Sequence, residues 1–325
     1  MMIEHWALLS MLLGAAIFLL AGALSPIESF AWWAGWLDED PASFPERDAE
    51  AFDGGKEERF FAVYLAGIDS IAGDKTTRRT ERFLTLIEAA APEVTIVSDV
   101  FPYAPSGRPL LAGPRLFLKT WRALYRLKLR RRSSILSNII NLRNLYQVLV
   151  SADHRYGPIF NAGAAHVILD ALLRAGYDLE KAPPICIIGY SGGGQIAAAS
   201  AEFLKAATGA RITVISVGGI IASTPGVAAL DMLHHLYGEK DSVQRLGAIM
   251  FPERWGVFPY SHWNLAKAQG RIQARCIGAM GHDRVGGYLG EGVDEDGEPF
   301  IRKTATAVAE VLKAETAAIS ACAQP

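Results

Sequence analysis

The stretch PPICIIGYSGGGQIAAASAEFLK, residues 183–205, decides the fold of this 325-residue chain. A run of apolar residues ends at Ser191, three glycines follow, and an alanine-rich segment comes next. The apolar run has the length and composition of a buried strand, and the alanine-rich segment has those of a helix. The sequence therefore predicts a strand, a sharp turn at Ser191 and a helix, with a hydroxyl group at the junction.

The segments on both sides of this stretch continue an alternation of strands and helices. Because continuously apolar strands between helices are typical of a parallel sheet covered on both faces, the expected fold class is α/β. The expected strands are 59–67, 93–100, 184–190, 211–219, 232–238 and 274–280. The expected helices are 76–91, 161–176, 193–207 and 304–319.

Composition leaves room for one large core and excludes several kinds of protein. Half of the residues are hydrophobic, and the net charge of −2 gives no reason to expect a nucleic-acid partner. Three widely spaced cysteines form neither a disulfide framework nor a zinc signature. Cys186 and Cys276 both lie in apolar runs, so we expect them to be small core residues.

The N-terminal segment has the character of a membrane anchor. Residues 6–24 are uncharged, which is the length needed to cross a bilayer as a helix, and three tryptophans follow at positions 32, 33 and 36. The alternative is a cleaved signal peptide with a cleavage site near Ala21-Gly22-Ala23. We expect residues 1–37 to form a single-pass N-terminal anchor, 38–58 an acidic linker and 59–325 the folded body, on the cytoplasmic side.

Residues 104–152 form a basic insertion between a predicted strand and a predicted helix. The chain has ten Lys and Arg residues but no Asp or Glu from position 100 to position 152. Arg115, Lys119, Arg122 and Arg126 recur at helical spacing and would form one basic stripe within 115–132. Two interpretations stay open: a helix that binds an anionic membrane surface, and a lid helix whose basic face is solvated.

Residues Gly189-Tyr190-Ser191-Gly192-Gly193 match the G-x-S-x-G pattern in its required setting, with a strand before it and a helix after it. Ligands of a parallel sheet bind beyond the carboxyl ends of its strands, where this serine would lie. The small neighbours let the strand and the helix approach closely, and the Gly192 N–H faces the place of a forming oxyanion. A phosphate-binding loop is the alternative, but the G-K-[ST] ending is missing.

With these residues in place, the chain resembles the α/β-hydrolase family over residues 60–320. The resemblance implies a mostly parallel central sheet with helices on both faces, a lid insertion, and a nucleophilic serine followed by an acid and then a histidine. Among the later histidines, only His282 follows the last predicted strand, so it is the expected base. His262 is the alternative, whereas His234 and His235 lie in a strand pattern where at least one must be packed.

The same resemblance places the acid just after the penultimate strand, which makes Asp241 the expected orienting carboxylate. Glu239 and Asp231 are the alternatives, although Asp231 precedes that strand. The second oxyanion donor should come from the loop after the first strand, where Ile68 is the candidate and Asp69 the alternative. Here the chain has Ala66-Gly67 at a place where the family often carries His-Gly.

The function implied is that of a serine hydrolase that cleaves a carboxylic ester or thioester through an acyl-enzyme. The apolar insertion near a membrane favours a lipophilic acyl substrate. Two alternatives remain: an acyltransferase that uses the same Ser191, Asp241 and His282, and a non-catalytic scaffold that binds a lipid or a partner. The expected chemistry requires no metal and no organic cofactor, and we expect no nucleic-acid partner.

Overall fold

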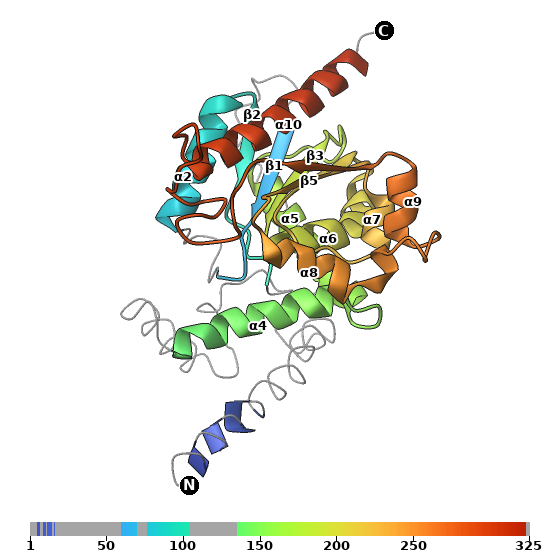
Figure 1. The fold of residues 1–325 in the computed structure, drawn as a ribbon. Helices are drawn as coiled ribbons and strands as arrows, with labels where there is room; N and C mark the ends of the chain where they lie inside the picture. Colours follow the sequence, from blue (N-terminus) through green and yellow to red (C-terminus); the bar gives the residue numbers. More distant parts are fainter. Residues whose placement is uncertain are drawn as a thin grey trace.

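Figure 1 shows the computed structural model, which describes residues 60–69, 77–103 and 135–322 together with a few helical residues between 5 and 16. Most of the predicted anchor, the whole acidic linker at 38–58 and the basic stripe within 115–132 lie outside the described residues. Within the described ranges, none of the helices combines the length and the apolar composition that a membrane span requires.

The core of the fold is a six-stranded sheet in which all strand pairs are parallel, in the order β2-β1-β3-β4-β5-β6. This confirms the expected α/β class with a parallel sheet. Residue Phe61 pairs with Ile185, and Ile188 pairs with Ile215, across the centre of the sheet. The strands are β1 Phe60–Leu65, β2 Val94–Val97, β3 Ile185–Tyr190, β4 Ile212–Val217, β5 Met232–Tyr237 and β6 Ile272–Cys276.

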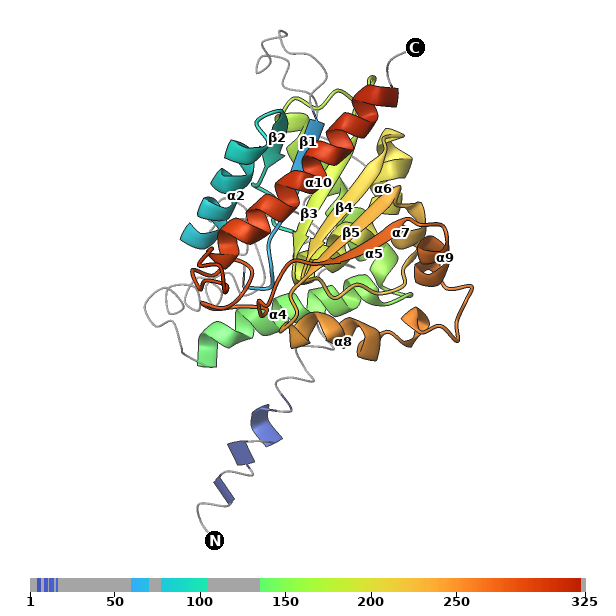
Figure 2. The same ribbon diagram turned by 45° about the horizontal axis from the view of Figure 1, so that its top comes forward.

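Helices cover both faces of this sheet (Figure 2). One face packs against α2 (Arg78–Ala90) and α10 (Phe300–Cys322), and the other packs against α5 (Gly157–Arg174) and α6 (Gly192–Thr208). Successive side chains of a strand point to opposite faces, so Val63 enters the core under α5 and α6 while Tyr64 enters the core under α2 and α10. Burial on both sides explains why the strands are apolar without alternation.

The last strand differs from its prediction. A strand was expected at 274–280 with Cys276 in the core, but β6 spans Ile272–Cys276 and most of its residues are exposed. Within the described residues, β6 pairs with β5 alone, so it forms an edge of the described sheet. The expectation that Cys276 is a core residue is therefore wrong, since its side chain is exposed, whereas Cys186 in β3 is fully buried as expected.

The strand order creates a topological switch point between β1 and β3 at the carboxyl edge of the sheet. From β1 the chain moves outward to β2 and then returns to place β3 on the opposite side of β1. The loops that follow β1 and β3 therefore diverge, and such a switch point is where ligands of parallel sheets bind. Helix α4 (Ile135–Ala152) runs along this carboxyl edge beside α8 (Ser242–Met250), as Figures 1 and 2 both show.

Candidate active site

Ser191 occupies a strained turn at the end of β3, directly before α6. Its backbone has φ 52° and ψ −121°, a conformation that residues with a side chain rarely adopt. The glycines around it allow the turn to be tight: a Cβ on Gly189 would lie 2.6 Å from the Gly194 Cα, and one on Gly193 would lie 2.4 Å from the Leu65 oxygen. The predicted strand, turn and helix are therefore confirmed, with the hydroxyl at their junction.

Three residues far apart in the sequence meet at this turn. The Ser191 Oγ lies 2.8 Å from the His282 Nε2, and the His282 Nδ1 lies 2.9 Å from the Asp241 Oδ2. His282 comes from the loop after β6, and Asp241 comes from the turn after β5. The serine, histidine and aspartate that the sequence analysis selected thus form one chain of hydrogen bonds, in the arrangement of a nucleophile, a base and an orienting acid.

Asp241 is fully buried and is held by four hydrogen bonds. Its Oδ1 accepts the Val243 N–H at 2.8 Å and the Gln244 N–H at 3.1 Å, which makes it the N-cap of α8. Burial alone would raise the pKa of this carboxyl group, but the hydrogen bonds from His282, Tyr288 and the Gln244 N–H outweigh burial and lower the pKa below its usual value. Asp241 is therefore ionised at neutral pH and is not a solvated turn residue.

The fourth hydrogen bond comes from Tyr288, a residue that the sequence analysis missed. Its hydroxyl donates to the Asp241 Oδ2 at 2.6 Å and accepts the Gly238 N–H at 2.8 Å. Burial and the neighbouring carboxylate raise the pKa of Tyr288 far above its usual value, so the phenol stays protonated and remains a donor. Tyr288 lies six residues after His282 in a glycine-rich loop without periodic pattern, and no sequence signal marks it.

Tyr190, the residue before the serine, supports the histidine from the other side. Its ring stacks on His282 with centroids 5.9 Å apart and planes at 17°, and its hydroxyl donates to the His282 carbonyl oxygen at 2.9 Å. The Tyr288 ring meets His282 edge-on, with centroids 6.0 Å apart. The imidazole is thus fixed by two aromatic rings and by its hydrogen bonds to Ser191 and Asp241.

The two predicted oxyanion donors lie next to each other. A Cβ on Gly192 would lie 2.9 Å from the Ile68 Cγ2, so the start of α6 and the loop after β1 are in contact. Within the described residues, neither the Gly192 N–H nor the Ile68 N–H has a hydrogen-bond partner. The alternative donor is the Asp69 N–H, which belongs to the same peptide group as the Ile68 carbonyl. That carbonyl oxygen accepts a hydrogen bond from Asn144 at 2.8 Å. Because C=O and N–H point in opposite directions in a trans peptide, the Asp69 N–H points away from Asn144.

The alternative bases have other positions in the fold. His235 is buried behind the site beside Ser216 and Gln244, and burial lowers its pKa to about 4. His234 pairs with Glu315 near the opposite end of the strands. As expected, at least one of the two adjacent histidines is packed inside the protein, and neither contacts the serine.

The alternative acids also lie elsewhere. Asp231 precedes β5 and forms an ion pair with Lys205 at 2.8 Å, at the amino end of the strands, as its position in the sequence predicts. Glu239 lies on the exposed turn after β5. Of these three candidate acids, Asp241 alone bonds to the imidazole.

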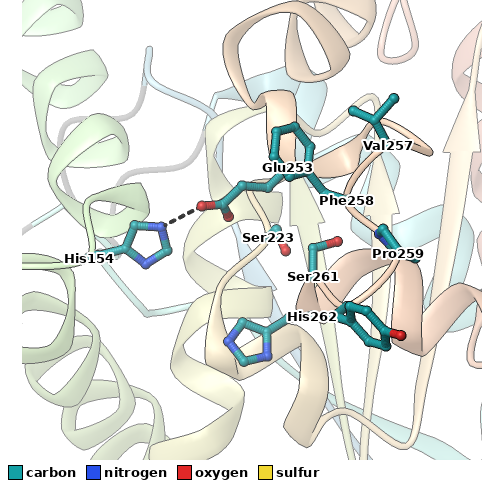
Figure 3. Close-up of a pocket in the computed structure, with 9 residues that line it drawn as sticks. His154, Ser223, Glu253, Val257, Phe258, Pro259, Ser261 and His262 are labelled. Carbon is teal, nitrogen blue, oxygen red and sulfur yellow. Dashed lines mark hydrogen bonds and ion pairs between the residues drawn. The ribbon is translucent and has the colours of Figure 1, made fainter.

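A pocket of about 390 Å³ opens between the end of α4, the loop after β4 and the segment from η1 (Pro252–Arg254) to α9 (His262–Ala268). Figure 3 shows its polar side, where His154 pairs with Glu253 at 3.1 Å. The alternative base His262 lines this pocket, with Ser223, Phe258 and Ser261.

One side chain connects α6, the helix that follows Ser191, with segments beside this pocket. Gln195, one helical turn after Ser191, accepts the Ala222 N–H at 2.7 Å and donates to the Ser151 Oγ at 3.4 Å. Ala222 precedes the lining residue Ser223, and Ser151 lies three residues before the lining residue His154. Gln195 therefore joins α6 to the two segments that lead into the pocket. The sequence analysis did not find it, because the loop from 252 to 262 has no periodic pattern.

Comparison with known proteins does not identify a relative with this arrangement of residues. No family model matches the chain, and no curated protein matches it.

Proposed function

We propose that this protein is a serine hydrolase of the α/β-hydrolase family that cleaves a carboxylic ester or thioester. The observation that carries the proposal is the hydrogen-bonded chain from Ser191 through His282 to the ionised Asp241. Two further features support it. Strained residues are common at functional sites, and Ser191 is strained. The switch point of a parallel sheet is a usual place for a ligand, and the serine lies there.

The hydrogen bonds support a role for each atom in the proposed reaction. Since Asp241 is ionised, it accepts a hydrogen bond from the His282 Nδ1–H, which keeps the proton on Nδ1 and leaves the Nε2 free to accept the Ser191 hydroxyl proton. Ser191 Oγ then attacks the carbonyl carbon as its proton moves to Nε2. The resulting imidazolium is stabilised by the Asp241 carboxylate and gives its proton to the departing alcohol or thiol.

The tetrahedral intermediate carries a negative oxygen, which the free N–H groups of Gly192 and Ile68 would bind. The Gly192 amide lies at the first turn of α6, where the helix dipole also favours negative charge. Water, activated by the same imidazole, then cleaves the acyl-enzyme and returns the proton to Ser191. An alcohol or amine in place of water would give acyl transfer, which analysis of the products distinguishes.

Replacing the nucleophile tests this proposal. Ser191→Ala should lower the hydrolysis of activated esters by about 10³-fold or more, because the members of a triad act as a unit. A fluorophosphonate probe should label the wild type and fail to label the variant. Equal activity of wild type and variant would refute the proposal, and a folded, unlabelled wild type would favour the non-catalytic binding protein.

An exposed apolar surface beside the pocket supports a lipophilic substrate. Asn264 donates to the carbonyl oxygens of Glu253, Trp255 and Phe258, so the loop before α9 is held in one shape although its side chains face water. Such a surface suits contact with a lipid-like molecule. Its exposed apolar side chains are Leu246, Ile249, Met250, Trp255, Val257, Phe258, Tyr260 and Leu265.

Membrane attachment through residues 1–37, and contact of the stripe 115–132 with an anionic membrane, remain proposals that rest on the sequence. Deleting 1–37 should release an active body into the soluble fraction. Replacing Arg115, Lys119, Arg122 and Arg126 with Gln should weaken binding of that body to anionic vesicles, since each cation contributes about 1 kcal/mol near such a surface. Wild-type body that fails to co-sediment with the vesicles at low salt would exclude the stripe as a membrane contact.

A further inference from the structure

Helix α4 presents buried polar side chains to the active site. Asn144, Val148 and Ser151 follow each other at spacings of four and three residues and therefore share one face of the helix. Val148 packs on the start of α6, since a Cβ on Gly192 would lie 2.7 Å from its Cγ2. Asn144 is fully buried, and an amide in such a place is costly unless it is hydrogen-bonded.

The side chain of Asn144 is bonded to the loop that carries the second oxyanion donor. Its Nδ2 donates to the Ile68 carbonyl oxygen at 2.8 Å. The hydroxyl of Tyr103, also fully buried, donates to the Ala66 carbonyl oxygen at 2.7 Å. Arg143, next to Asn144, donates to the Tyr103 carbonyl oxygen at 2.9 Å and so joins α4 to the residue that holds the other end of the loop.

The hydrogen bonds to the Ala66 and Ile68 carbonyl oxygens lie on either side of the peptide group that carries the Ile68 N–H. The Ile68 N–H belongs to the peptide that joins Gly67 to Ile68, and the two held carbonyls belong to the peptides before and after it. Glycine adopts many backbone conformations, so this peptide could rotate and present the Gly67 oxygen in place of the Ile68 N–H. An oxygen there would repel an oxyanion. Because the carbonyls on both sides are held, this peptide can turn only by a concerted rotation about the Gly67 ψ and Ile68 φ bonds, which is a more restricted motion than that of a free loop.

We propose that Asn144 is a positioning residue that keeps the Ile68 N–H directed at the oxyanion, with Tyr103 in the same role at the other end of the loop. The proposal rests on the hydrolase function proposed above and adds a reason for the buried amide on α4. Neither residue touches the reacting atoms. Both act through the backbone of residues 66–69, so the insertion that carries α4 is part of the catalytic apparatus.

Replacing the donor tests this role. Asn144→Leu, which keeps the volume but not the N–H, should lower kcat by about 10- to 100-fold with little change in KM, since an oxyanion donor acts mainly in the transition state. Tyr103→Phe removes one atom and should have a smaller effect in the same direction. A trifluoromethyl ketone, whose adduct with Ser191 carries an oxyanion, should bind more weakly in proportion to the loss of kcat/KM.

Thr208→Val is the matched control, because it removes a buried hydrogen bond to the Leu204 carbonyl oxygen and one from the Ala210 N–H at the far end of α6, away from the loop. It should lower the melting temperature and leave kcat and ketone affinity unchanged. Hydrogen exchange of the Ile68 and Asp69 amides should accelerate in Asn144→Leu and not in Thr208→Val.

The outcomes separate this proposal from the hydrolase proposal. If wild-type activity depends on Ser191 but folded Asn144→Leu keeps kcat within twofold, the positioning role is wrong. If Asn144→Leu does not fold, Tyr103→Phe decides by the same measurements. If Ser191→Ala is as active as wild type, the hydrolase proposal and the oxyanion role both fail, and amide exchange still reports whether Asn144 holds the loop.

Discussion

The Tyr288 hydroxyl donates a hydrogen bond of 2.6 Å to the same Asp241 oxygen that accepts the His282 Nδ1–H. The oxygen that orients the imidazole is therefore shared between two donors. Because the phenol also accepts the Gly238 N–H, its own position is fixed by the turn that carries Asp241. Tyr288 therefore influences both the position of the Asp241 carboxylate and the distribution of its negative charge.

Tyr288→Phe should lower kcat/KM by about 10-fold, because a hydrogen bond to a charged group is lost from a buried site. A carboxylate without this donor binds the protonated imidazole more tightly, so the acidic limb of the activity profile should move to higher pH. Measuring kcat/KM against pH for wild type and variant tests this. A uniform loss of activity at every pH would mean that Tyr288 only supports the packing.

Asp241→Asn should reduce kcat by about 10³- to 10⁴-fold, and His282→Ala should reduce it further, since orientation is lost in the first case and the base itself in the second. The control is Asp231→Asn, which breaks the ion pair with Lys205 at the other end of the strands. That variant should change stability and leave kcat unchanged. Greater damage from Glu239→Gln than from Asp241→Asn would show that the acid has been misassigned.

Gly218→Ala should damage the site by steric conflict. Gly218 has φ +59°, and a Cβ there would lie 2.4 Å from the Tyr288 ring and 3.0 Å from the Asp241 Oδ2. Gly209 offers a matched control, since it has φ +69° and no atom within 4 Å of an added Cβ. Gly209→Ala should cost about 1 kcal/mol of stability from backbone strain alone and keep full activity.

Gly218→Ala should destabilise the protein by more than its control does, and it should lower kcat as Tyr288 is displaced. Chemical denaturation and steady-state kinetics of both variants separate the effect of backbone strain from that of the steric clash with Tyr288. Equal effects of the two substitutions would show that the space around Tyr288 is not needed.

Glu315 predicts a pH dependence of stability that is independent of catalysis. Its side chain is nearly buried and bonds His234 and Thr213, both at 3.1 Å, toward the amino ends of the strands. The hydrogen bond to His234, helped by that to Thr213 and opposed by burial, lowers the pKa of this carboxyl group. A carboxylate with a lowered pKa stabilises the fold above its ordinary pKa, and this contribution is lost as the pH falls through the folded value.

Glu315→Gln should therefore lower the free energy of unfolding by about 1–3 kcal/mol at neutral pH. The difference from wild type should shrink as the pH falls from about 5 to about 3, because the wild-type carboxylate is then protonated as well. Urea denaturation at several pH values measures this. Esterase activity at neutral pH is the control and should be the same in wild type and variant. A difference that is independent of pH would exclude an ionised Glu315 as its cause.

Local signals were enough to predict the sheet and the turn at Ser191. The pattern around Ser191 specifies a strand, a turn and a helix through steric requirements of neighbouring residues. Asp241 and His282 were selected through the resemblance to the α/β-hydrolase family, which implies an acid and then a histidine after the serine, together with their positions after the last two predicted strands.

The supporting residues could not be found in that way. Tyr288 and Asn144 act through single hydrogen bonds to residues 47 and 76 positions away. Asn144 lies within the predicted insertion at 104–152, and nothing local indicates that its amide is buried. The exposure of β6 was likewise missed, since apolar residues near Cys276 do not reveal which strand is the outermost.

The backbone strain at Ser191 has a thermodynamic consequence. A side chain at φ 52° costs about 1–3 kcal/mol, and glycine at the same place avoids that cost. Ser191→Gly should therefore unfold at a higher temperature than Ser191→Ala, and no lower than wild type, although it has lost the nucleophile. Serine at position 191 is then less favourable for folding than glycine, although the proposed chemistry requires its hydroxyl group. A melting curve can reveal this conflict between foldability and activity without any substrate in hand.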